Sequence, residues 1–245
     1  MNADLPSDAD LPSDPATPVL LYRDAMMLVI NKPAGLPVHP GPAAKQRVIP
    51  TLTDHLDDLR FGLPRKPEAV HRLDKDTSGC LVLGRHAKAL ARLNDLFRQG
   101  RIGKSYWAVV EGGPTEAAGL IDMALGRKDA TRGWWMKADP EGLPSQTRFR
   151  VLGRTADRTW LELEPLTGRT HQLRVHCAAS GWPILGDSVY GTGERDGPVT
   201  IHLHARHLSI PLYPKREAVT VTAKVPPHML AALTKCGFTD RKSVV

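Results

Sequence analysis

The sequence is poor in the features that mark secreted, membrane-bound or metal-dependent proteins. Its three cysteines, Cys80, Cys177 and Cys236, lie far apart and form no zinc-type spacing, so we expect reduced structural thiols. No apolar run reaches the roughly 18 residues that a membrane-spanning helix needs. The acidic N-terminus has neither the basic start nor the apolar core of a signal peptide. These absences predict a cytoplasmic protein with no membrane partner.

Phosphate-binding signatures are absent as well. The sequence contains no P-loop and no Gly-rich dinucleotide fingerprint, so we expect no bound nucleotide cofactor. What the chain does have is positive charge, with 33 basic and 26 acidic residues and a net charge of +7. A basic protein favours a polyanionic partner, with RNA or DNA first, although many soluble proteins are equally basic without one.

The first residues differ in composition from the rest of the chain. The hexapeptide ADLPSD occurs at 3–8 and again at 9–14, and residues 1–17 contain aspartate but no lysine or arginine. Such an acidic, proline-rich segment has little to bury, and we expect a disordered tail over residues 1–17. No later linker is long enough to separate a second domain, so residues 18–245 are expected to form one domain.

Hydrophobic periodicity predicts a mixed set of short elements in that domain. Helices are predicted at 86–99, 170–180 and 229–234. In the first of these, the buried face is expected to contain Ala87, Leu90, Leu93 and Phe97. Strands are predicted at 19–22, 26–31, 80–84, 106–110, 160–164, 201–210 and 218–223. Because strands and helices do not alternate regularly, the order argues against a doubly wound parallel sheet and favours an α+β fold.

A polar segment precedes the apolar run at 80–84. It reads HRLDKDTSG over residues 71–79, and its Asp, Thr, Ser and Gly residues are turn formers. A loop of this kind can deliver polar side chains to the end of a sheet, where catalytic residues are often found. The alternative from these residues alone is a turn whose side chains only satisfy backbone groups.

This segment resembles the HRLDxxTSG signature of RluA-type RNA pseudouridine synthases at every fixed position. Three more segments match the same family in the same order: NKPAGL at 31–36, KSY at 104–106 and TGRTHQLRVH at 167–176. The last match is extended by PILGD at 183–187 and by Tyr190-Gly191. The resemblance runs from about residue 18 to about residue 227, and four ordered motifs make it specific.

The resemblance implies a fold and a reaction. The fold is a curved mixed, mainly antiparallel sheet in two lobes, with flanking helices and a central RNA-binding cleft, and residues 18–245 would be its catalytic domain. In the reaction a uridine of ribosomal RNA, transfer RNA or both is flipped out, and its glycosidic bond moves from N1 to C5. No metal or other cofactor is implied. Only residues 1–17 precede the region of resemblance, so we expect a short form without an S4 domain, acting on RNA rather than DNA as a monomer.

Asp74 matches the essential aspartate of that family. Its carboxylate could attack ribose C1′ to give a sugar ester, or remove the C2′ proton to give a glycal, and the sequence does not choose between them. Asp76 is the nearby rival, because paired carboxylates can also act on a glycosidic bond. Asp76 occupies a variable position of the motif, however, so we interpret it as a turn residue.

The family match assigns further residues to the site. Arg169 would pair with the catalytic carboxylate, Tyr106 would stack on the uracil and assist proton transfer, and Leu173 would pack on the same ring. Arg72 matches an arginine that can fill the gap left by a flipped base. Lys32 is expected either to contact phosphate or to brace the fold.

The stretch 127–137 mixes basic and aromatic residues. Arg132, Trp134, Trp135 and Lys137 could contact phosphates and stack on unpaired bases. A solvated hairpin whose tryptophans pack inward is an equally good interpretation.

Two other classes of protein remain as alternatives. His202, His204 and His207 form an HxHxxH run like that of zinc hydrolases, although Arg206 would be an unfavourable neighbour for a metal ion. Histidines of an ordinary strand are the preferred interpretation. A non-catalytic RNA-binding protein is the second alternative, and it would not need Asp74, Tyr106 and Arg169 together.

Overall fold

The computed structural model describes residues 17–40, 50–127, 135–194, 197 and 199–239. The chain divides into two compact units, which are considered one at a time. Unit 1 comprises residues 1–104 and 205–224, and unit 2 comprises residues 105–204 and 225–245. The tail predicted at residues 1–17 falls almost wholly outside the described residues.

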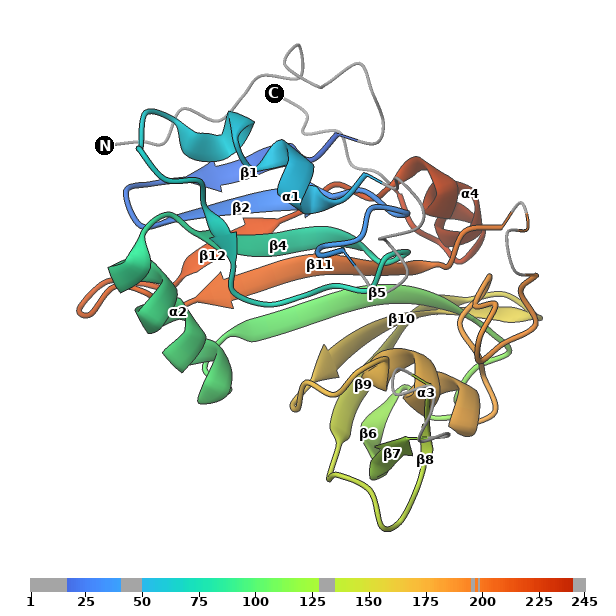
Figure 1. Cartoon of the computed structure of the whole chain (residues 1–245). Helices are drawn as coiled ribbons and strands as arrows, with labels where there is room; N and C mark the ends of the chain where they lie inside the picture. The colour runs from blue at the N-terminus through green and yellow to red at the C-terminus, as the bar shows by residue number, and fades with distance from the viewer. Residues whose placement is uncertain (1–16, 41–49, 128–134, 195–196, 198, 240–245) are drawn as a thin grey trace. The chain divides into compact units, whose positions relative to one another are not determined.

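Unit 1 is built on antiparallel strand pairs. Its strands follow the order β1 (Val19–Arg23), β2 (Met27–Lys32), β4 (Ser78–Gly84) and β11 (Leu203–Ile210), as Figure 1 shows. At the sides, β3 (Glu68–Ala69) pairs with β4, and β12 (Val219–Thr222) pairs with β11. The helical segments of this unit are α1 (Leu52–His55), the short 3-10 turn η3 (Asp58–Arg60) and α2 (Ala87–Arg98).

The sequence pattern located helix α2 but assigned one residue to the wrong face. The His86 side chain caps the helix by accepting a hydrogen bond from the Ala89 N–H, and the chain turns away at Gly100 with φ +65°. The buried positions are Ala89, Leu93 and Leu96. The expectation for Ala87 was wrong, because it lies one step around the helix from the buried stripe and is exposed.

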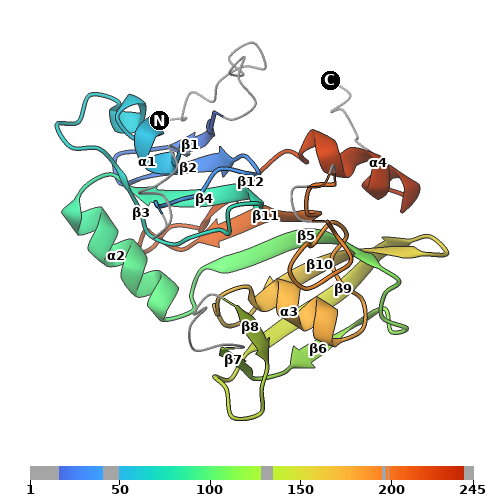
Figure 2. The ribbon, with the colours of Figure 1, turned by 45° about the vertical axis from the view of Figure 1, so that its right-hand side comes forward.

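Unit 2 is a sheet covered by one helix on each face. Its strands follow the order β5 (Gly103–Glu111), β10 (Arg158–Pro165), β9 (Gln146–Arg154) and β6 (Ala118–Asp122), all antiparallel. A separate hairpin consists of β7 (Leu125–Arg127) and β8 (Met136–Ala138). The helices are α3 (Gln172–Ala179) and α4 (Pro227–Lys235), and Figure 2 shows α3 beside the strands of this unit.

Alternation along the strands decides which helix covers which face. Ala108 and Leu161 pack in one buried cluster with Leu173 of α3. Val109, the neighbour of Ala108, packs instead with Met229 of α4. Because successive strand residues point to opposite faces, α3 and α4 must cover opposite sides of this sheet.

The predicted mixed, mainly antiparallel sheet with flanking helices is confirmed, and so are the positions of its seven predicted strands and three predicted helices to within a few residues. The prediction missed β9, although Phe149 and Val151 alternate there with Arg148 and Arg150. Strand β6 gave a weaker signal, because only Ile121 in it is buried. None of the helices in the described part of the chain has the length and apolarity that crossing a bilayer requires.

Candidate active site

Asp74 lies in the loop of unit 1 that enters β4. Its backbone carbonyl accepts a hydrogen bond of 3.1 Å from the Thr77 N–H, which closes a tight turn. Lys75 and Asp76 occupy the exposed tip of that turn, while Asp74 itself is partly buried. Thr77 and the residues that follow are buried in the sheet. The predicted position of this loop at the start of β4 is confirmed, and the loop is anchored where it enters the buried strand.

Lys32 is the principal brace of this loop. Its side chain is 0% exposed, and Nζ donates to the carbonyl oxygens of Pro33 at 2.7 Å, Leu36 at 2.8 Å and Lys75 at 2.9 Å. The Lys75 carbonyl also accepts from the Gly35 N–H at 2.9 Å. A buried ammonium with all three protons engaged has none left for phosphate, so the assignment of Lys32 to RNA binding was wrong. Of the two predicted roles, bracing is the one the contacts support.

The environment of Lys32 is electrostatically unusual. Burial lowers the pKa of Lys32 to about 7, while the negative charges of Asp76 and Asp74 act in the opposite direction. Three carbonyl acceptors match the three donors of the ammonium form, and a neutral amine would leave one of them unsatisfied. The ammonium form of Lys32 therefore fits the three carbonyls that hold the Asp74 loop, and burial opposes its charge.

We expect Lys32→Met to destabilise the protein by about 3 kcal/mol, because the Pro33 and Leu36 carbonyls lose the Lys32 donor, the Lys75 carbonyl keeps the Gly35 N–H, and each unsatisfied buried group costs about 1–3 kcal/mol. Urea unfolding followed by circular dichroism measures the change. Lys75→Met is the matched control, since that side chain is exposed and its backbone carbonyl is retained. Equal stability of both variants and the wild type would show that Lys32 is not a brace.

His71 and Gly79 hold the two ends of the same loop. His71 Nε2 accepts a hydrogen bond of 2.9 Å from the Val82 N–H, and its ring stacks on Phe97 with centroids 4.5 Å apart. Gly79 has φ +112°, and a Cβ there would lie 2.3 Å from the Ala205 carbonyl oxygen. Only glycine permits this close approach. These contacts show that His71 and Gly79 shape the loop rather than provide reacting groups.

Acidification is expected to destabilise the fold through His71, which is partly buried, and His202, which is buried. Burial, with a smaller contribution from Lys104, lowers the pKa of His71 from 6.5 to about 3, and burial lowers that of His202 to about 4. Below pH 6.5 the unfolded chain takes up protons that the folded chain does not, so stability falls as the pH falls. The slope is about 1.4 kcal/mol per pH unit for each histidine.

Urea unfolding at pH 7.5 and pH 5.0 measures this loss. His71→Gln keeps an acceptor for the Val82 N–H but does not titrate, so this variant should lose less stability between the two pH values than the wild type. An equal loss in both proteins would mean that His71 does not contribute.

Unit 2 carries Tyr106, Leu173 and Arg169. Tyr106 lies on β5 opposite Leu163 of β10, and its partly buried ring packs against the cluster that contains Leu173. Tyr106 and Leu173 thus belong to one hydrophobic cluster, and their predicted contacts with uracil remain a prediction. Arg169 is exposed in the loop between β10 and α3, where its Nε lies 3.4 Å from the Pro144 carbonyl oxygen. Arg72, by contrast, belongs to unit 1, where it is exposed.

Gln172 organises the Arg169 loop and was not singled out from the sequence. Its Oε1 accepts from the Thr167 hydroxyl at 2.7 Å and from the Arg169 N–H at 3.0 Å. Its Nε2 donates to the Gln146 carbonyl at 2.9 Å and to the Thr147 hydroxyl at 3.0 Å. The side chain is buried with four hydrogen bonds. The available signal was its position in the TGRTHQLRVH segment at 167–176, directly before the predicted helix continues.

A buried ion pair fixes α3 to the turn that follows it. Arg174 Nε and Nη2 each donate to Asp187 at 2.8 Å, and the two side chains are 8% and 1% exposed. Burial by itself would raise the pKa of Asp187, but the hydrogen bonds and charge of Arg174 outweigh it and hold that pKa below the usual range. Asp187 also accepts from the Val189 and Tyr190 N–H groups. The pair was not predicted, although PILGD belongs to the matched motifs.

Only part of the basic-aromatic segment at 127–137 belongs to the described residues. Arg132 and Trp134 lie outside the described residues, so their RNA-binding role remains a prediction. Lys137 is exposed on β8 and forms an ion pair of 3.2 Å with Asp139, and Trp135 is partly buried. The neighbouring Met136 packs with Leu125 and Val175, so α3 supports the base of the hairpin.

The histidine run does not gather metal ligands. His202 Nδ1 lies 2.9 Å from the Thr200 carbonyl oxygen, and His207 Nδ1 lies 2.9 Å from the Thr222 hydroxyl. Across the described residues, no group of three His, Cys, Asp or Glu side chains could hold a metal ion. His202 and His204 are buried. These contacts are those of strand histidines, and they give the metallohydrolase alternative no support.

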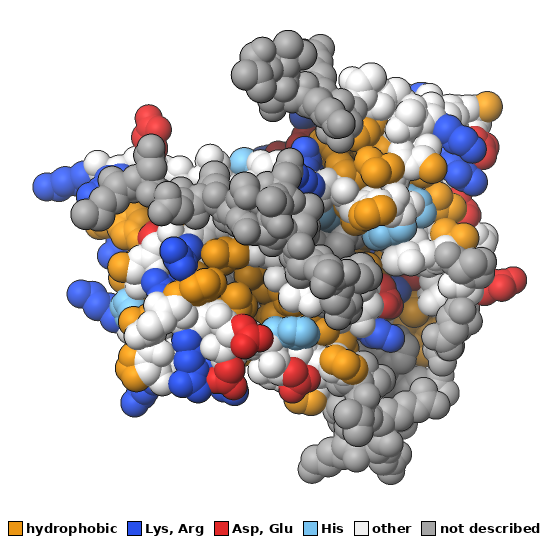
Figure 3. All heavy atoms as spheres, turned by 90° about the horizontal axis from the view of Figure 1, so that it is seen from above, with side chains coloured by type: hydrophobic (Ala, Val, Ile, Leu, Met, Phe, Trp, Pro, Cys, Tyr) orange, Lys and Arg blue, Asp and Glu red, His pale blue; other side chains and the backbone are white. Residues whose placement is uncertain are grey.

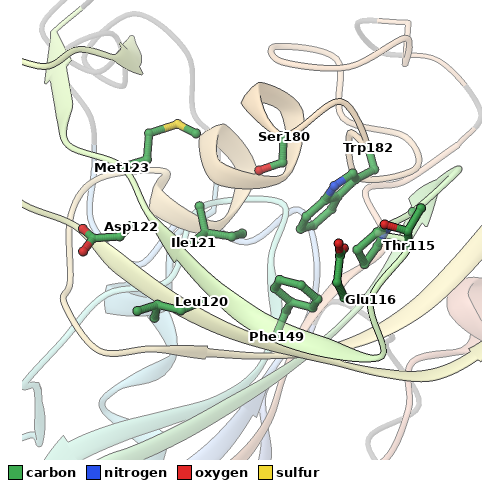
Figure 4. A pocket seen from close by; sticks show the side chains of 11 residues that line it. Thr115, Glu116, Leu120, Ile121, Asp122, Met123, Phe149, Ser180 and Trp182 are labelled. Atoms are coloured by element: carbon green, nitrogen blue, oxygen red, sulfur yellow. The ribbon is translucent and has the colours of Figure 1, made fainter.

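A pocket and the distribution of surface charge are two further features of the described residues. In unit 2 a pocket of about 510 Å³ is lined by residues that include Phe149, Trp182 and Glu116, and Figure 4 shows the side chains around it. None of Tyr106, Arg169 or Leu173 lines it. In the face shown in Figure 3, lysine and arginine side chains are scattered among acidic and apolar ones rather than gathered in one patch.

Comparison with known proteins identifies the chemistry that such residues serve. Residues 26–179 match the family model described as RNA pseudouridylate synthase. The chain belongs to this family. An uncharacterized RNA pseudouridine synthase of Zymomonas mobilis is 40% identical over 221 residues, covering 89% of this chain and 97% of the relative. The RluA-type resemblance and the assignment as an isomerase acting on RNA uridines are confirmed.

Other relatives have more specific names. The ribosomal large subunit pseudouridine synthase C of Vibrio cholerae is 33% identical over 222 residues, covering 88% of this chain and 68% of that protein. Among solved structures, human RNA pseudouridylate synthase domain containing 1 is 32% identical with a TM-score of 0.72, covering 92% of this chain and 89% of that one. The family therefore extends over nearly the whole described chain.

Proposed function

We propose that this family member isomerises one or a few uridines of ribosomal RNA, with transfer RNA as a further substrate class, and that Asp74 is the catalytic carboxylate. The observation that carries the proposal is the placement of Asp74. It lies at a tight turn in a loop held by Lys32 and His71, within the matched residues 26–179, and the HRLDxxTSG resemblance supports its assignment as the essential aspartate. A catalytic group needs such a rigid mount, because small displacements reduce the rate strongly.

The proposed reaction needs no external oxidant or cofactor. The C1′–N1 bond breaks, uracil turns within the site, and a C1′–C5 bond forms while C5 loses its proton and N1 gains one. Asp74 either forms a transient ester at C1′ or removes the C2′ proton to give a glycal. Arg169 would keep the carboxylate ionised and oriented, and Tyr106 with Leu173 would hold the uracil ring.

RNA recognition is proposed to involve base flipping. A uridine inside a helix is inaccessible to a carboxylate, and Arg72, exposed beside the Asp74 loop, could stack in the gap that the flipped base leaves. We place the reaction in the cytoplasm and expect a monomer. Three free, buried cysteines agree with a reducing compartment.

The substrate class rests on relatives whose names specify the large ribosomal subunit, including the Vibrio cholerae protein. Pseudouridine mapping of ribosomal and transfer RNA tests it, using cells that lack this gene and are rescued with the wild type or with Asp74→Asn. We expect one or a few ribosomal sites to vanish, to return with the wild type and to stay absent with Asp74→Asn. Return of the sites with Asp74→Asn would show that Asp74 is not the catalytic carboxylate, and persistence of every site in cells that lack the gene would favour an RNA-binding role without catalysis.

A further inference from the structure

His171 has a backbone conformation that its residue type rarely adopts. It precedes α3 with φ 52° and ψ 20°, in the left-handed region that favours glycine. It also lies two residues after Arg169. A non-glycine residue stays in this region only when surrounding contacts hold it there, and such residues are concentrated at functional sites.

Tyr190 supplies a contact that holds His171. The Tyr190 hydroxyl lies 2.9 Å from His171 Nδ1 and accepts a hydrogen bond of 3.0 Å from the Met136 N–H. The Tyr190 backbone is fixed in turn, because its N–H donates to Asp187 at 3.0 Å. The Arg174 guanidinium lies 5.2 Å from the centre of the Tyr190 ring. The Tyr190 hydroxyl therefore links the backbone of β8 to the His171 side chain.

The same turn is held from its other end by Gln172. The Gln172 N–H donates to the Arg169 carbonyl at 3.1 Å, and the Arg169 N–H donates to Gln172 Oε1 at 3.0 Å. The backbone of Arg169 is therefore tied through both of its polar groups. The direction of the Arg169 side chain depends on the conformation of Thr170 and His171, which lie between Arg169 and Gln172. Of these two residues, His171 has the left-handed conformation.

We propose that Tyr190 is a positioning residue for pseudouridine formation, whose hydroxyl holds His171 in its left-handed conformation and so orients Arg169. The inference rests on the proposed role of Arg169 in catalysis. Because Met136 lies on β8, the same hydroxyl ties the β7–β8 hairpin to the Arg169 turn. Tyr190 acts through Arg169 and needs no contact with the RNA.

Tyr190→Phe removes the hydroxyl and keeps the ring that packs against Arg174. Tyr213→Phe is the matched control, because it removes a hydroxyl that donates to Asp24 at 2.6 Å within unit 1. With ribosomal RNA fragments at saturating enzyme, we expect Tyr190→Phe to convert uridine about tenfold more slowly, the cost of about one hydrogen bond, with an RNA Kd within about twofold of the wild type. Tyr213→Phe should convert at the wild-type rate. A wild-type rate for Tyr190→Phe, or a loss confined to RNA affinity, would overturn the proposal.

A second variant tests the route through His171. Glycine adopts the left-handed region without support. Adding Tyr190→Phe to His171→Gly should therefore not reduce the rate of uridine conversion further. Losses that multiply in the double variant would refute the coupling. Hydrogen exchange of the free protein gives a readout independent of activity, since exchange at the Arg169 and Gln172 amides should be faster in Tyr190→Phe and unchanged in Tyr213→Phe. If the wild type converts no uridine, the proposed function fails, while this exchange measurement still decides the positioning role.

Discussion

Asp74→Asn is expected to abolish uridine conversion, with a loss of at least about 10³-fold under single-turnover conditions. An amide can neither attack C1′ nor accept the C2′ proton, so both mechanisms open to the carboxylate disappear, and removal of a catalytic nucleophile or base costs about this much or more. The substitution is nearly isosteric, and we expect the folded structure to be unchanged. Quantifying pseudouridine in a transcribed ribosomal RNA fragment measures the loss.

Asp76→Asn is the control for this experiment. Asp76 lies in the same turn, is exposed, and undergoes the same chemical change. It should retain nearly the wild-type rate. If Asp76→Asn were inactive and Asp74→Asn active, the catalytic assignment would move to Asp76. If both were inactive, a mechanism with two carboxylates would regain support.

A labelled substrate distinguishes the two mechanisms for Asp74. Deuterium at C2′ of the target ribose slows conversion if Asp74 removes the proton there in a rate-limiting step. Direct attack at C1′ leaves that bond intact, so the two substrates should then react at similar rates. Trapping of an RNA–protein adduct through Asp74 would be the complementary result.

Asp187→Asn is expected to destabilise the protein by about 3–5 kcal/mol, because it leaves the buried Arg174 guanidinium without a counter-charge. The loss would lower Tm by about 10 °C at the usual conversion for a chain of this size. Asp187 also anchors the Tyr190 backbone, so residual activity at low temperature should fall as well. Thermal unfolding by differential scanning fluorimetry provides the measurement.

Asp157→Asn is the matched control for the ion pair. Asp157 lies 3.5 Å from Arg158 but is 75% exposed, and such pairs contribute about 1 kcal/mol or less. A double replacement, Arg174→Met with Asp187→Leu, should cost less than Asp187→Asn alone, since no unpaired charge remains buried. Equal effects of Asp187→Asn and Asp157→Asn would contradict the importance assigned to the buried pair.

The sequence was sufficient where the information is local. Turn formers before an apolar run located the Asp74 loop at the entry to β4, and apolar periodicity located α2. Strand β6 was missed, because most of its residues are exposed and the strand exists through its pairing with β9. A sheet edge of this kind depends on a partner, and periodicity does not reveal it.

Lys32 is a residue whose role the sequence alone did not reveal. A lysine in a motif of an RNA enzyme suggests a phosphate contact, yet the side chain is fully buried and binds a carbonyl 43 residues away along the chain. Burial is a property of the folded chain and is not encoded in residue type. The roles of Gln172 and Tyr190 were hidden for the same reason, since their partners lie on other strands and turns.

The sequence by itself determined the family, the reaction class and the carboxylate to test first, because short motifs carry the reacting groups and their spacing. The tertiary structure decided how those groups are held: Lys32 beneath the Asp74 turn, Gln172 within the Arg169 loop, and Tyr190 against His171. The physical reason is that hydrogen bonds acquire their strength and direction from burial and from partners remote in sequence, which only folding brings together.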